Sequence, residues 1–285
     1  MVKAKVILLA AAVLALAGCS RGPYSWEWHK HMIDGHRTGV TVPSAGNPEK
    51  AIGTVKDGVY TAPNGKVFKG GATPEVARLM TEVQPELAML KEVIAYAPSP
   101  MVKGRPESEL SNYIADRLRA DVQELVAPKP VDLAITNFGG IRVDVPAGDV
   151  LVDDIVSMLP FKNYLCYLRL KGSDILHWFD YMAQNSVQCI SGAQITVEDH
   201  KLVSAAIGGK KVDPNKVYGL ATIDFLLDGG DGLKLARNAI EYIQSDITIG
   251  EAILRDIKAL GAAGQPWEYS KDGRCIVRKD KEEED

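Results

Sequence analysis

Residues 135–142 read Ile-Thr-Asn-Phe-Gly-Gly-Ile-Arg, and the organisation of the chain can be worked out from this stretch. The apolar residues just before it predict a short buried strand, which passes into a polar loop. Gly139 and Gly140 would let the backbone approach a ligand closely. Asn137 offers both a donor and an acceptor, and Arg142 offers a planar fork suited to phosphate. The stretch therefore predicts either a ligand-binding loop or a plain glycine turn with a surface arginine.

Two later stretches favour the ligand-binding loop. Residues 158–163 read Met-Leu-Pro-Phe-Lys-Asn, and residues 224–232 read Asp-Phe-Leu-Leu-Asp-Gly-Gly-Asp-Gly. Together with 137–142, and in this order, they resemble the C-terminal substrate-binding domain of the 5′-nucleotidase / UDP-sugar hydrolase family of bacteria and animals. The resemblance also takes in Arg-Pro-Glu-Ser at 105–108 with the helix that follows, and it covers roughly residues 85–260.

The resemblance implies a role for each motif. Phe161 and Phe225 would sandwich a base, and Asp231 would accept hydrogen bonds from ribose hydroxyls. Asn137 and Arg142 would hold the base edge or the phosphate. These roles suit the residue types, because aromatic stacking tolerates any base and a carboxylate is purely an acceptor. The alternative is two core phenylalanines and an ordinary Gly-Asp-Gly turn.

Two features depart from the family pattern. The family usually has an aromatic residue directly after Gly-Gly-Asp-Gly, where this chain has Leu233. Arg105 does not align securely with the family's arginine at a helix entrance, so it is a weaker candidate for substrate binding. Arg105 and Glu107 precede a predicted helix at 108–126, where exposed N–H groups favour an anion. A cluster that only caps the helix is the equal alternative.

The catalytic half of that family is missing from the sequence. The resemblance implies a two-metal site built, in this order, from an Asp-x-His start, a Gly-Asn-His-Glu loop and a paired histidine segment. The sequence does not contain this set, because the Gly-Asn-His-Glu loop is absent and the Asp-x-His triplet at 34–36 follows His29 and His31. There is also no Gly-x-Ser-x-Gly elbow and no phosphate-binding P-loop. We therefore expect no cofactor and no catalytic residue in this chain, and divalent metals in a partner phosphatase. The five histidines, which together do not form this set, are His29, His31, His36, His177 and His200.

The first residues predict export and lipidation. Residues 1–18 combine two lysines with an apolar run that ends Leu-Ala-Gly before Cys19, as in bacterial lipoprotein signals. Cys19 is expected to carry lipid and to anchor the chain to a membrane of the bacterial cell envelope, on an extracytoplasmic side. The other thiols, which are odd in number, are expected to be buried and free, and they are Cys166, Cys189 and Cys275.

Composition and local patterns predict the domain organisation. A formal charge of −4 provides no electrostatic footprint for a nucleic acid, although one or two arginines suffice for a nucleotide. Residues 19–72 are expected to form a tether and a small irregular module with a hairpin around Pro-Asn-Gly at 63–65. Residues 73–278 would form one mixed α/β domain of α+β class, and 279–285 a charged tail.

Within that domain, periodicity predicts the main helices and strands. Helices are expected from Thr73 with a break at Pro85, then over 108–126, over 150–158, from a Ser173 cap, and from a Thr248 capping box. Strands are expected at 164–170 and 217–223, with a hairpin over 195–206.

Three hypotheses follow for function. The first is the nucleotide-recognition half of a split 5′-nucleotidase that works with a separately encoded dimetal phosphatase in extracytoplasmic nucleotide catabolism. The second is a stand-alone nucleotide- or nucleoside-binding lipoprotein without a hydrolase role. The third is a structural remnant that binds no nucleotide.

Overall fold

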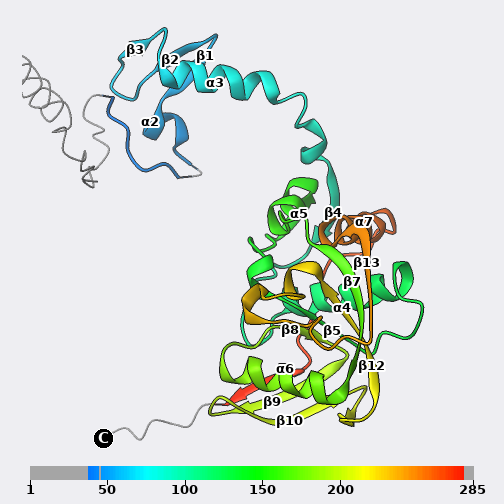
Figure 1. Cartoon of the computed structure of the whole chain (residues 1–285). Helices are drawn as coiled ribbons and strands as arrows, with labels where there is room; N and C mark the ends of the chain where they lie inside the picture. Colours follow the sequence, from blue (N-terminus) through cyan, green and yellow to red (C-terminus); the bar gives the residue numbers. More distant parts are fainter. Residues whose placement is uncertain (1–37, 45, 279–285) are drawn as a thin grey trace, which may run out of the picture. The chain divides into compact units, whose positions relative to one another are not determined.

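The computed structural model describes residues 38–44 and 46–278, which form two compact units divided after Val83 (Figure 1). Each unit is described by itself. The predictions that concern the signal peptide, Cys19, the first three histidines and the tail 279–285 lie outside the described residues.

The described part of the first unit is a small antiparallel sheet with two helices. Helix α2 (Pro48–Ile52) precedes strands β1 (Thr54–Lys56), β2 (Val59–Thr61) and β3 (Val67–Phe68). The pairing of β2 with β3 confirms the hairpin predicted around residues 63–65. Helix α3 (Ala72–Val83) packs against β2, so it belongs to this unit, whereas the predicted boundary placed it in the following domain. It ends before Pro85, as expected of a residue that breaks helices.

The second unit is organised around a five-stranded mixed sheet of order β13-β7-β12-β5-β8. Only β12 and β5 run parallel, and the other neighbouring pairs are antiparallel. This arrangement confirms an α+β fold with a mixed sheet. The strands are β5 (Leu133–Thr136), β7 (Tyr164–Lys171), β8 (Cys189–Ser191), β12 (Val217–Ile223) and β13 (Glu241–Thr248).

Two smaller sheets complete the second unit. One has the order β11-β10-β9-β14, and its β9–β10 pair confirms the predicted hairpin. Its strands are β9 (Ala193–Glu198), β10 (Lys201–Ile207), β11 (Lys210–Lys211) and β14 (Cys275–Arg278). The other pairs β4 (Val93–Ala97) with β6 (Gly148–Leu151). Residues 148–151 therefore form a strand before helix α5 (Val152–Met158), where the sequence predicted helix from residue 150.

Of two predicted helix caps, one is present in the structure and the other is not. Thr248 caps α7 (Ile249–Ala262) in a capping box with Glu251, as predicted. The predicted Ser173 cap is wrong, because α6 (Gly172–Gln184) begins one residue earlier and Lys171 makes no side-chain cap. The first amides of α6 instead donate to backbone carbonyls of the loop before β12: Gly172 N to Lys216 O and Ser173 N to Pro214 O. Tertiary partners thus replace the local cap.

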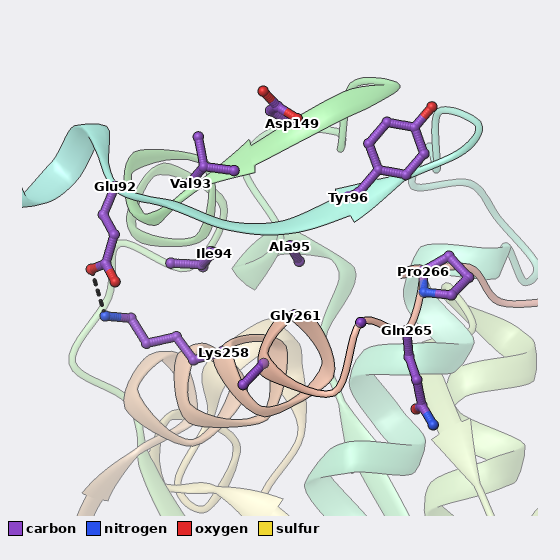
Figure 2. Close-up of a pocket in the computed structure, with 12 residues that line it drawn as sticks. Glu92, Val93, Ile94, Ala95, Tyr96, Asp149, Lys258, Gly261, Gln265 and Pro266 are labelled. Carbon is purple, nitrogen blue, oxygen red and sulfur yellow. Dashed lines mark hydrogen bonds and ion pairs between the residues drawn. The ribbon is translucent and has the colours of Figure 1, made fainter.

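Helix α7 supports β4 at unusually close range (Figure 2). A Cβ added at Gly261 would lie 1.8 Å from the carbonyl oxygen of Ile94, so only glycine allows this approach. Lys258 of α7 pairs with Glu92 at 2.7 Å, and Trp267 N donates to Tyr96 O at 2.8 Å. These contacts border an open hollow of about 810 Å³ between β4 and the end of α7.

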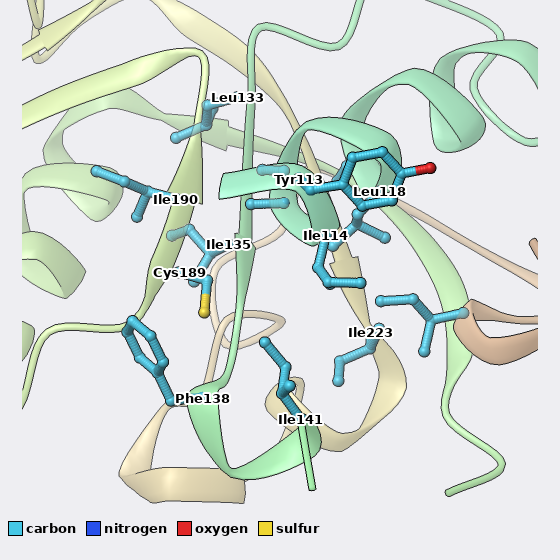
Figure 3. Close-up of a cluster of buried hydrophobic side chains, with 14 of the residues drawn as sticks. Tyr113, Ile114, Leu118, Leu133, Ile135, Phe138, Ile141, Cys189, Ile190 and Ile223 are labelled. Atoms are coloured by element: carbon cyan, nitrogen blue, oxygen red, sulfur yellow. The ribbon is translucent and has the colours of Figure 1, made fainter. Parts of the chain in front are cut away.

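The core beneath the predicted loop joins α4 (Glu109–Leu125) to the main sheet (Figure 3). Ile114 and Leu118 of α4 lie among buried side chains of β5, β8 and β12. Phe138 and Ile141, which follow β5, are 6% and 1% exposed and close the end of this cluster. The loop at 137–142 is therefore anchored by its own apolar side chains, and its polar residues are held at the edge of the core.

The three thiols of the second unit are buried and free, as predicted. Burial raises the pKa of Cys166 and of Cys275 to about 12 and also raises the pKa of Cys189, so these thiols stay protonated near neutral pH. Within residues 38–44 and 46–278, no helix is both long enough and apolar enough to cross a bilayer.

Candidate functional site

The loop at 137–142 is a short 3-10 turn at the end of β5. Residues 138–140 form the turn, and Ile141 N donates to Phe138 O at 3.2 Å. Arg142 N donates to Met158 O at 2.9 Å, which ties the loop to the end of α5. Because residues 158–163 follow from that helix end, the fold brings the first predicted motif next to the second.

Asn137 and Asp231 connect the first motif to the third. Asn137 is 4% exposed, and its Nδ2 donates to Asp231 Oδ2 at 2.9 Å across 94 positions of sequence. The Oδ1 of Asn137 is buried and has no hydrogen-bond partner among the described residues. A buried acceptor without a partner is costly, so this oxygen is suited to receive a donor from a ligand or a water.

The two glycines of the loop make room for the Asn137 side chain. A Cβ at Gly140 would lie 2.9 Å from Asn137 Oδ1, and a Cβ at Gly139 would lie 3.3 Å from Asn137 Nδ2 and 3.7 Å from Asp231 Oδ2. Neither glycine adopts a positive φ. In this structure the two glycines accommodate the Asn137 amide, and the close approach of a ligand to the backbone stays a prediction.

Phe161 and Phe225 are surface residues. Their exposed fractions are 48% and 45%, so the alternative that both are core phenylalanines is wrong. The guanidinium of Arg142 lies 5.7 Å from the centroid of the Phe161 ring and donates to Gly139 O at 3.1 Å. Two exposed aromatic rings, one of them beside an arginine, provide the stacking faces and the charge that a nucleotide needs.

Asp224 joins the loops that carry the two phenylalanines. Its Oδ1 accepts from Tyr164 N at 2.9 Å and from Phe225 N at 2.9 Å. The carboxylate thereby holds the beginning of β7, three residues after Phe161, beside the turn that carries Phe225. The first predicted motif thus contacts each of the other two directly, and Tyr164, the residue directly after the second motif, links the second to the third.

The turn that presents Asp231 is built from tight glycine contacts. Gly229 has φ +113 and Asp231 has φ 49, both in the left-handed region. A Cβ at Gly230 would lie 2.0 Å from Phe225 O, and one at Gly232 would lie 1.8 Å from Tyr181 Oη. These contacts fix the position of Asp231, which is exposed. Leu233, where the family pattern has an aromatic residue, is fully buried and belongs to the core.

A small cavity adjoins the buried side of this cluster. Its polar lining includes Asn137, Thr136 and Asn163, and Phe161 and Gly140 also border it. One of these lining residues, Asn137, carries the unpartnered Oδ1. The arrangement can therefore offer an acceptor beside an aromatic face, with a carboxylate and a guanidinium close by.

Arg105 contacts the loop at 137–142 through Phe138 but lines a different hollow. Its guanidinium lies 4.5 Å over the ring of Phe138, and its Nε donates to Ser186 Oγ at 3.1 Å. The hollow that it lines does not include Asn137, Arg142 or the two exposed phenylalanines. The structure therefore does not bring Arg105 into the cluster formed by the other predicted residues.

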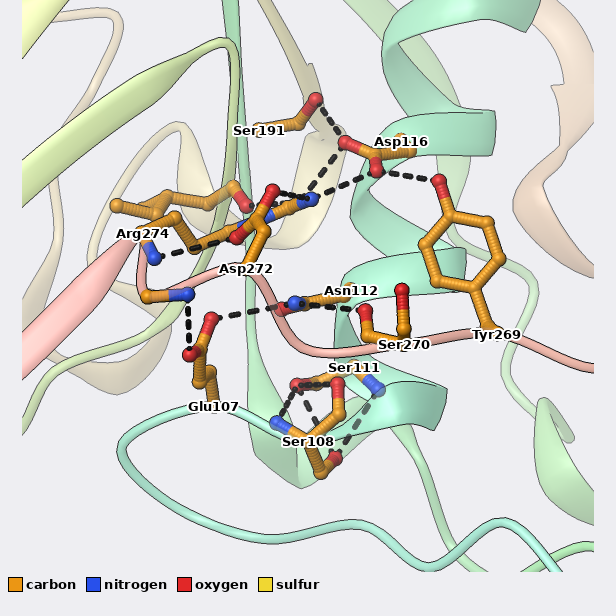
Figure 4. Close-up of polar contacts among 12 residues, drawn as sticks. Glu107, Ser108, Ser111, Asn112, Asp116, Ser191, Tyr269, Ser270, Asp272 and Arg274 are labelled. Carbon is orange, nitrogen blue, oxygen red and sulfur yellow. Dashed lines mark hydrogen bonds and ion pairs between the residues drawn. The ribbon is translucent and has the colours of Figure 1, made fainter.

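The entrance of α4 is a capping cluster (Figure 4). Ser108 and Ser111 form a reciprocal capping box, in which the amide of each residue donates to the hydroxyl of the other. Glu107 accepts from Asn112 Nδ2 at 3.1 Å and from Gly273 N at 2.8 Å. Of the two alternatives left open by the sequence, the structure favours capping, because the amides of Ser108 and Ser111 and the carboxylate of Glu107 have partners within the chain.

Sequence reasoning missed Lys103. Its Nζ donates to Ile141 O at 2.6 Å, and its backbone N donates to Asp144 Oδ1 at 2.9 Å. A second cation thus lies next to the loop that carries Arg142. Lys103 belongs to no recognisable motif. The pairing of Met101 with Val145 brings its segment next to the loop.

Within the part of the chain that the structure describes, no three His, Cys, Asp or Glu side chains are placed to hold a metal ion together. His177 packs its ring against Trp178, with centroids 4.8 Å apart.

Comparison with known proteins identifies the domain. The family described as "5′-nucleotidase, C-terminal domain" matches residues 93–237, which is more than half of the chain. Protein UshA of Yersinia enterocolitica is 34% identical over 132 residues, which cover 45% of this chain and 24% of that protein. The 5′-nucleotidase of Vibrio cholerae is 28% identical over 152 residues, which cover 52% of this chain and 27% of that protein.

The fold is also known from crystal structures. A 5′-nucleotidase precursor from Thermus thermophilus aligns with a TM-score of 0.63 and 24% identity, covering 72% of this chain and 43% of that chain. The chain spans about a quarter of the length of the two curated relatives above. The match over residues 93–237, which contains all three predicted motifs, confirms the resemblance, and the chain belongs to the 5′-nucleotidase C-terminal domain family.

Proposed function

We propose that this chain is the nucleotide-recognition component of a 5′-nucleotidase whose dimetal phosphatase is a separate polypeptide. The observation that carries the proposal is the contact of Asn137 with Asp231 beside the exposed Phe161 and Phe225. In this assignment the two rings stack on the base, Asp231 accepts from ribose hydroxyls, and the unpartnered Asn137 oxygen accepts from the base edge.

Arg142 and Lys103 would face the phosphate. Arg142 lies between the turn at 138–140 and the Phe161 ring, and Lys103 Nζ reaches the carbonyl of the residue before Arg142. Two cations beside one stacking face suit a nucleoside monophosphate better than a free nucleoside. The phosphate would then be presented to the metal ions of the partner, which supplies the hydrolytic chemistry.

The proposed setting is the bacterial cell envelope, outside the cytoplasm. The support is the lipoprotein-like sequence of residues 1–19, with lipid on Cys19 as the membrane anchor. A chain held at a membrane surface raises the local concentration of a partner that is held there too.

The proposal is tested by measuring nucleotide binding and phosphate release separately. Calorimetric titration of the purified chain with AMP should show saturable binding without added metal. Phosphate release from AMP in the presence of divalent metal should be absent for the chain alone and should appear when the separately encoded metallophosphatase is added. Asp231→Asn should weaken AMP binding and lower the combined activity at limiting AMP, while Asp228→Asn, an exposed neighbour in the same turn, serves as the matched control.

The outcomes separate the remaining hypotheses. Robust phosphate release by this chain alone would contradict the split enzyme. AMP binding without any activity in the presence of the phosphatase supports a stand-alone binding lipoprotein. The absence of AMP and adenosine binding at millimolar ligand supports a structural remnant.

A further inference from the structure

The second unit contains a hollow of about 600 Å³ that is separate from the candidate nucleotide site. A volume of this size is typical of pockets for small molecules. Four separated segments line it: the loop before α4, the end of α6 with the residues that follow, the β9–β10 hairpin, and the end of β14. We call it the Arg105 hollow, and its lining includes Arg105, Met182, Val187, Val197, His200 and Arg278.

The walls of the Arg105 hollow are apolar. Met182, Val187 and Val197 line it and are each less than 8% exposed, so they form its floor. Val277 of β14 also lines it and is 39% exposed, so its side chain stands in the opening. An apolar body of a few carbons would cover these surfaces and remove them from water.

The rim of the Arg105 hollow is basic. Arg105, His200 and Arg278 contribute to it, and none of the described residues that line the hollow is acidic. Arg278 pairs with Glu198 at 2.7 Å, an exposed pair that offsets part of its charge. Arg105 is held by two neutral groups, the ring of Phe138 and the hydroxyl of Ser186. Its guanidinium is thus positioned while its charge remains available to an anion.

We propose that the Arg105 hollow binds a small anion with an apolar body, such as a medium-chain carboxylate. The charged group would lie against Arg105 and Arg278, and the apolar body would lie on the floor beneath them. A guanidinium forms charge-assisted bonds with a carboxylate, and neither a neutral amphiphile nor a small hydrophilic anion could satisfy both parts of the hollow. The site shares no lining residue with the cluster around Asn137 and Asp231.

Calorimetric titration of the full chain with octanoate tests the proposal, with octanamide and acetate as controls for charge and for the apolar body. Octanoate should bind saturably, and both controls should bind much more weakly. Arg105→Gln should weaken octanoate about tenfold to hundredfold, as expected for loss of hydrogen bonds to a charged group. Val277→Trp should block the hollow from its exposed side. Lys210→Gln, which removes an exposed charge outside the hollow, should leave octanoate binding unchanged.

Two further measurements make the result decisive. Thermal unfolding followed by circular dichroism should show that Arg105→Gln and Val277→Trp remain folded, because both side chains are exposed. AMP titrated in saturating octanoate should bind as it does without octanoate. The proposal is overturned if Arg105→Gln binds octanoate like the wild type, or if AMP displaces octanoate. It is also overturned if octanoate does not bind saturably.

Discussion

Truncating Phe161 or Phe225 should weaken nucleotide binding much more than it destabilises the fold. Full burial of a phenylalanine side chain contributes about 1.5–3 kcal/mol, and these side chains are 48% and 45% exposed. Half of that contribution is about 0.7–1.5 kcal/mol, and removal of an exposed ring leaves no closed cavity. The stability cost of Phe161→Ala should therefore be about 1 kcal/mol.

The binding cost of the same change should be larger. Stacking on one base contributes about 1–3 kcal/mol, which corresponds to roughly a fivefold to 150-fold increase in the Kd for AMP. Phe161→Ala also removes the ring beside Arg142, so it should affect AMP slightly more than adenosine. Phe225→Ala should affect both ligands alike, although the loss of its packing on Gly230 could loosen the turn that presents Asp231.

Phe179→Ala is the matched control, because Phe179 of α6 is fully buried in the core. Its truncation should cost about 3–5 kcal/mol of unfolding free energy. Urea denaturation midpoints and calorimetric Kd values for AMP would be measured for all three variants. If Phe161→Ala and Phe225→Ala lower the midpoint as far as Phe179→Ala does, or if AMP affinity is unchanged in both, the stacking assignment is wrong.

Three further predictions concern the site and the fold. Arg142→Ala should weaken the binding of AMP more than that of adenosine. Asp231→Asn should weaken the binding of both ligands and should affect 2′-deoxyadenosine less. Unchanged affinities for all three ligands in both variants would refute the site. Gly261→Ala should lower the unfolding free energy of the second unit, measured by urea denaturation, by about 1–3 kcal/mol, because the added Cβ would overlap Ile94 O. Alanine has the better helix propensity, so a neutral or stabilising effect would contradict this close packing. Asp116→Asn should cost about 1.5–3 kcal/mol at pH 7, and the difference from wild type should shrink below about pH 4.

The sign of the Asp116 effect follows from its surroundings. Burial alone would raise the pKa of this carboxyl, but hydrogen bonds from Arg274, Ser191 and Tyr269 hold the pKa below its usual value of 3.8. A depressed pKa stabilises the folded state above the unfolded pKa, and that stabilisation is lost as the pH falls through the folded pKa. Urea denaturation of the wild type and of Asp116→Asn at pH 7 and near pH 3 checks this prediction. A difference in unfolding free energy that stays constant across this range would contradict it.

The predicted motifs located the site because each keeps its chemistry within a few consecutive residues. Asn137, Phe161 and Asp231 each stand in a short stretch with a recognisable order of neighbours. Their mutual contacts could not be predicted, since the bond from Asn137 to Asp231 joins residues 94 positions apart. Such a contact depends on how the strands of the main sheet are ordered, and periodicity within one strand carries no information about its neighbours.

Local patterns failed where a tertiary partner replaced a local one. Ser173 has the right chemistry for a cap, but its amide donates to Pro214 O and the helix starts before it. Residues 150 and 151 were expected to begin a helix, because a short apolar run does not distinguish strand from helix. Pairing with β4 selects the strand, and that pairing is visible only in three dimensions.

Arg105 shows why proximity in sequence to a helix entrance is weak support for a role in binding. The amides of Ser108 and Ser111 at the entrance of α4 donate to each other's hydroxyl groups, so these residues serve as the cap of the helix. Arg105 turns instead to Phe138, whose ring forms part of the same turn that places Asn137 and Arg142. One face of that turn therefore presents the groups assigned to the nucleotide, while Phe138 supports the arginine of a second, apolar and basic hollow. A single substitution, Phe138→Ala, should disturb both ligands at once, whereas Arg105→Gln should disturb only octanoate.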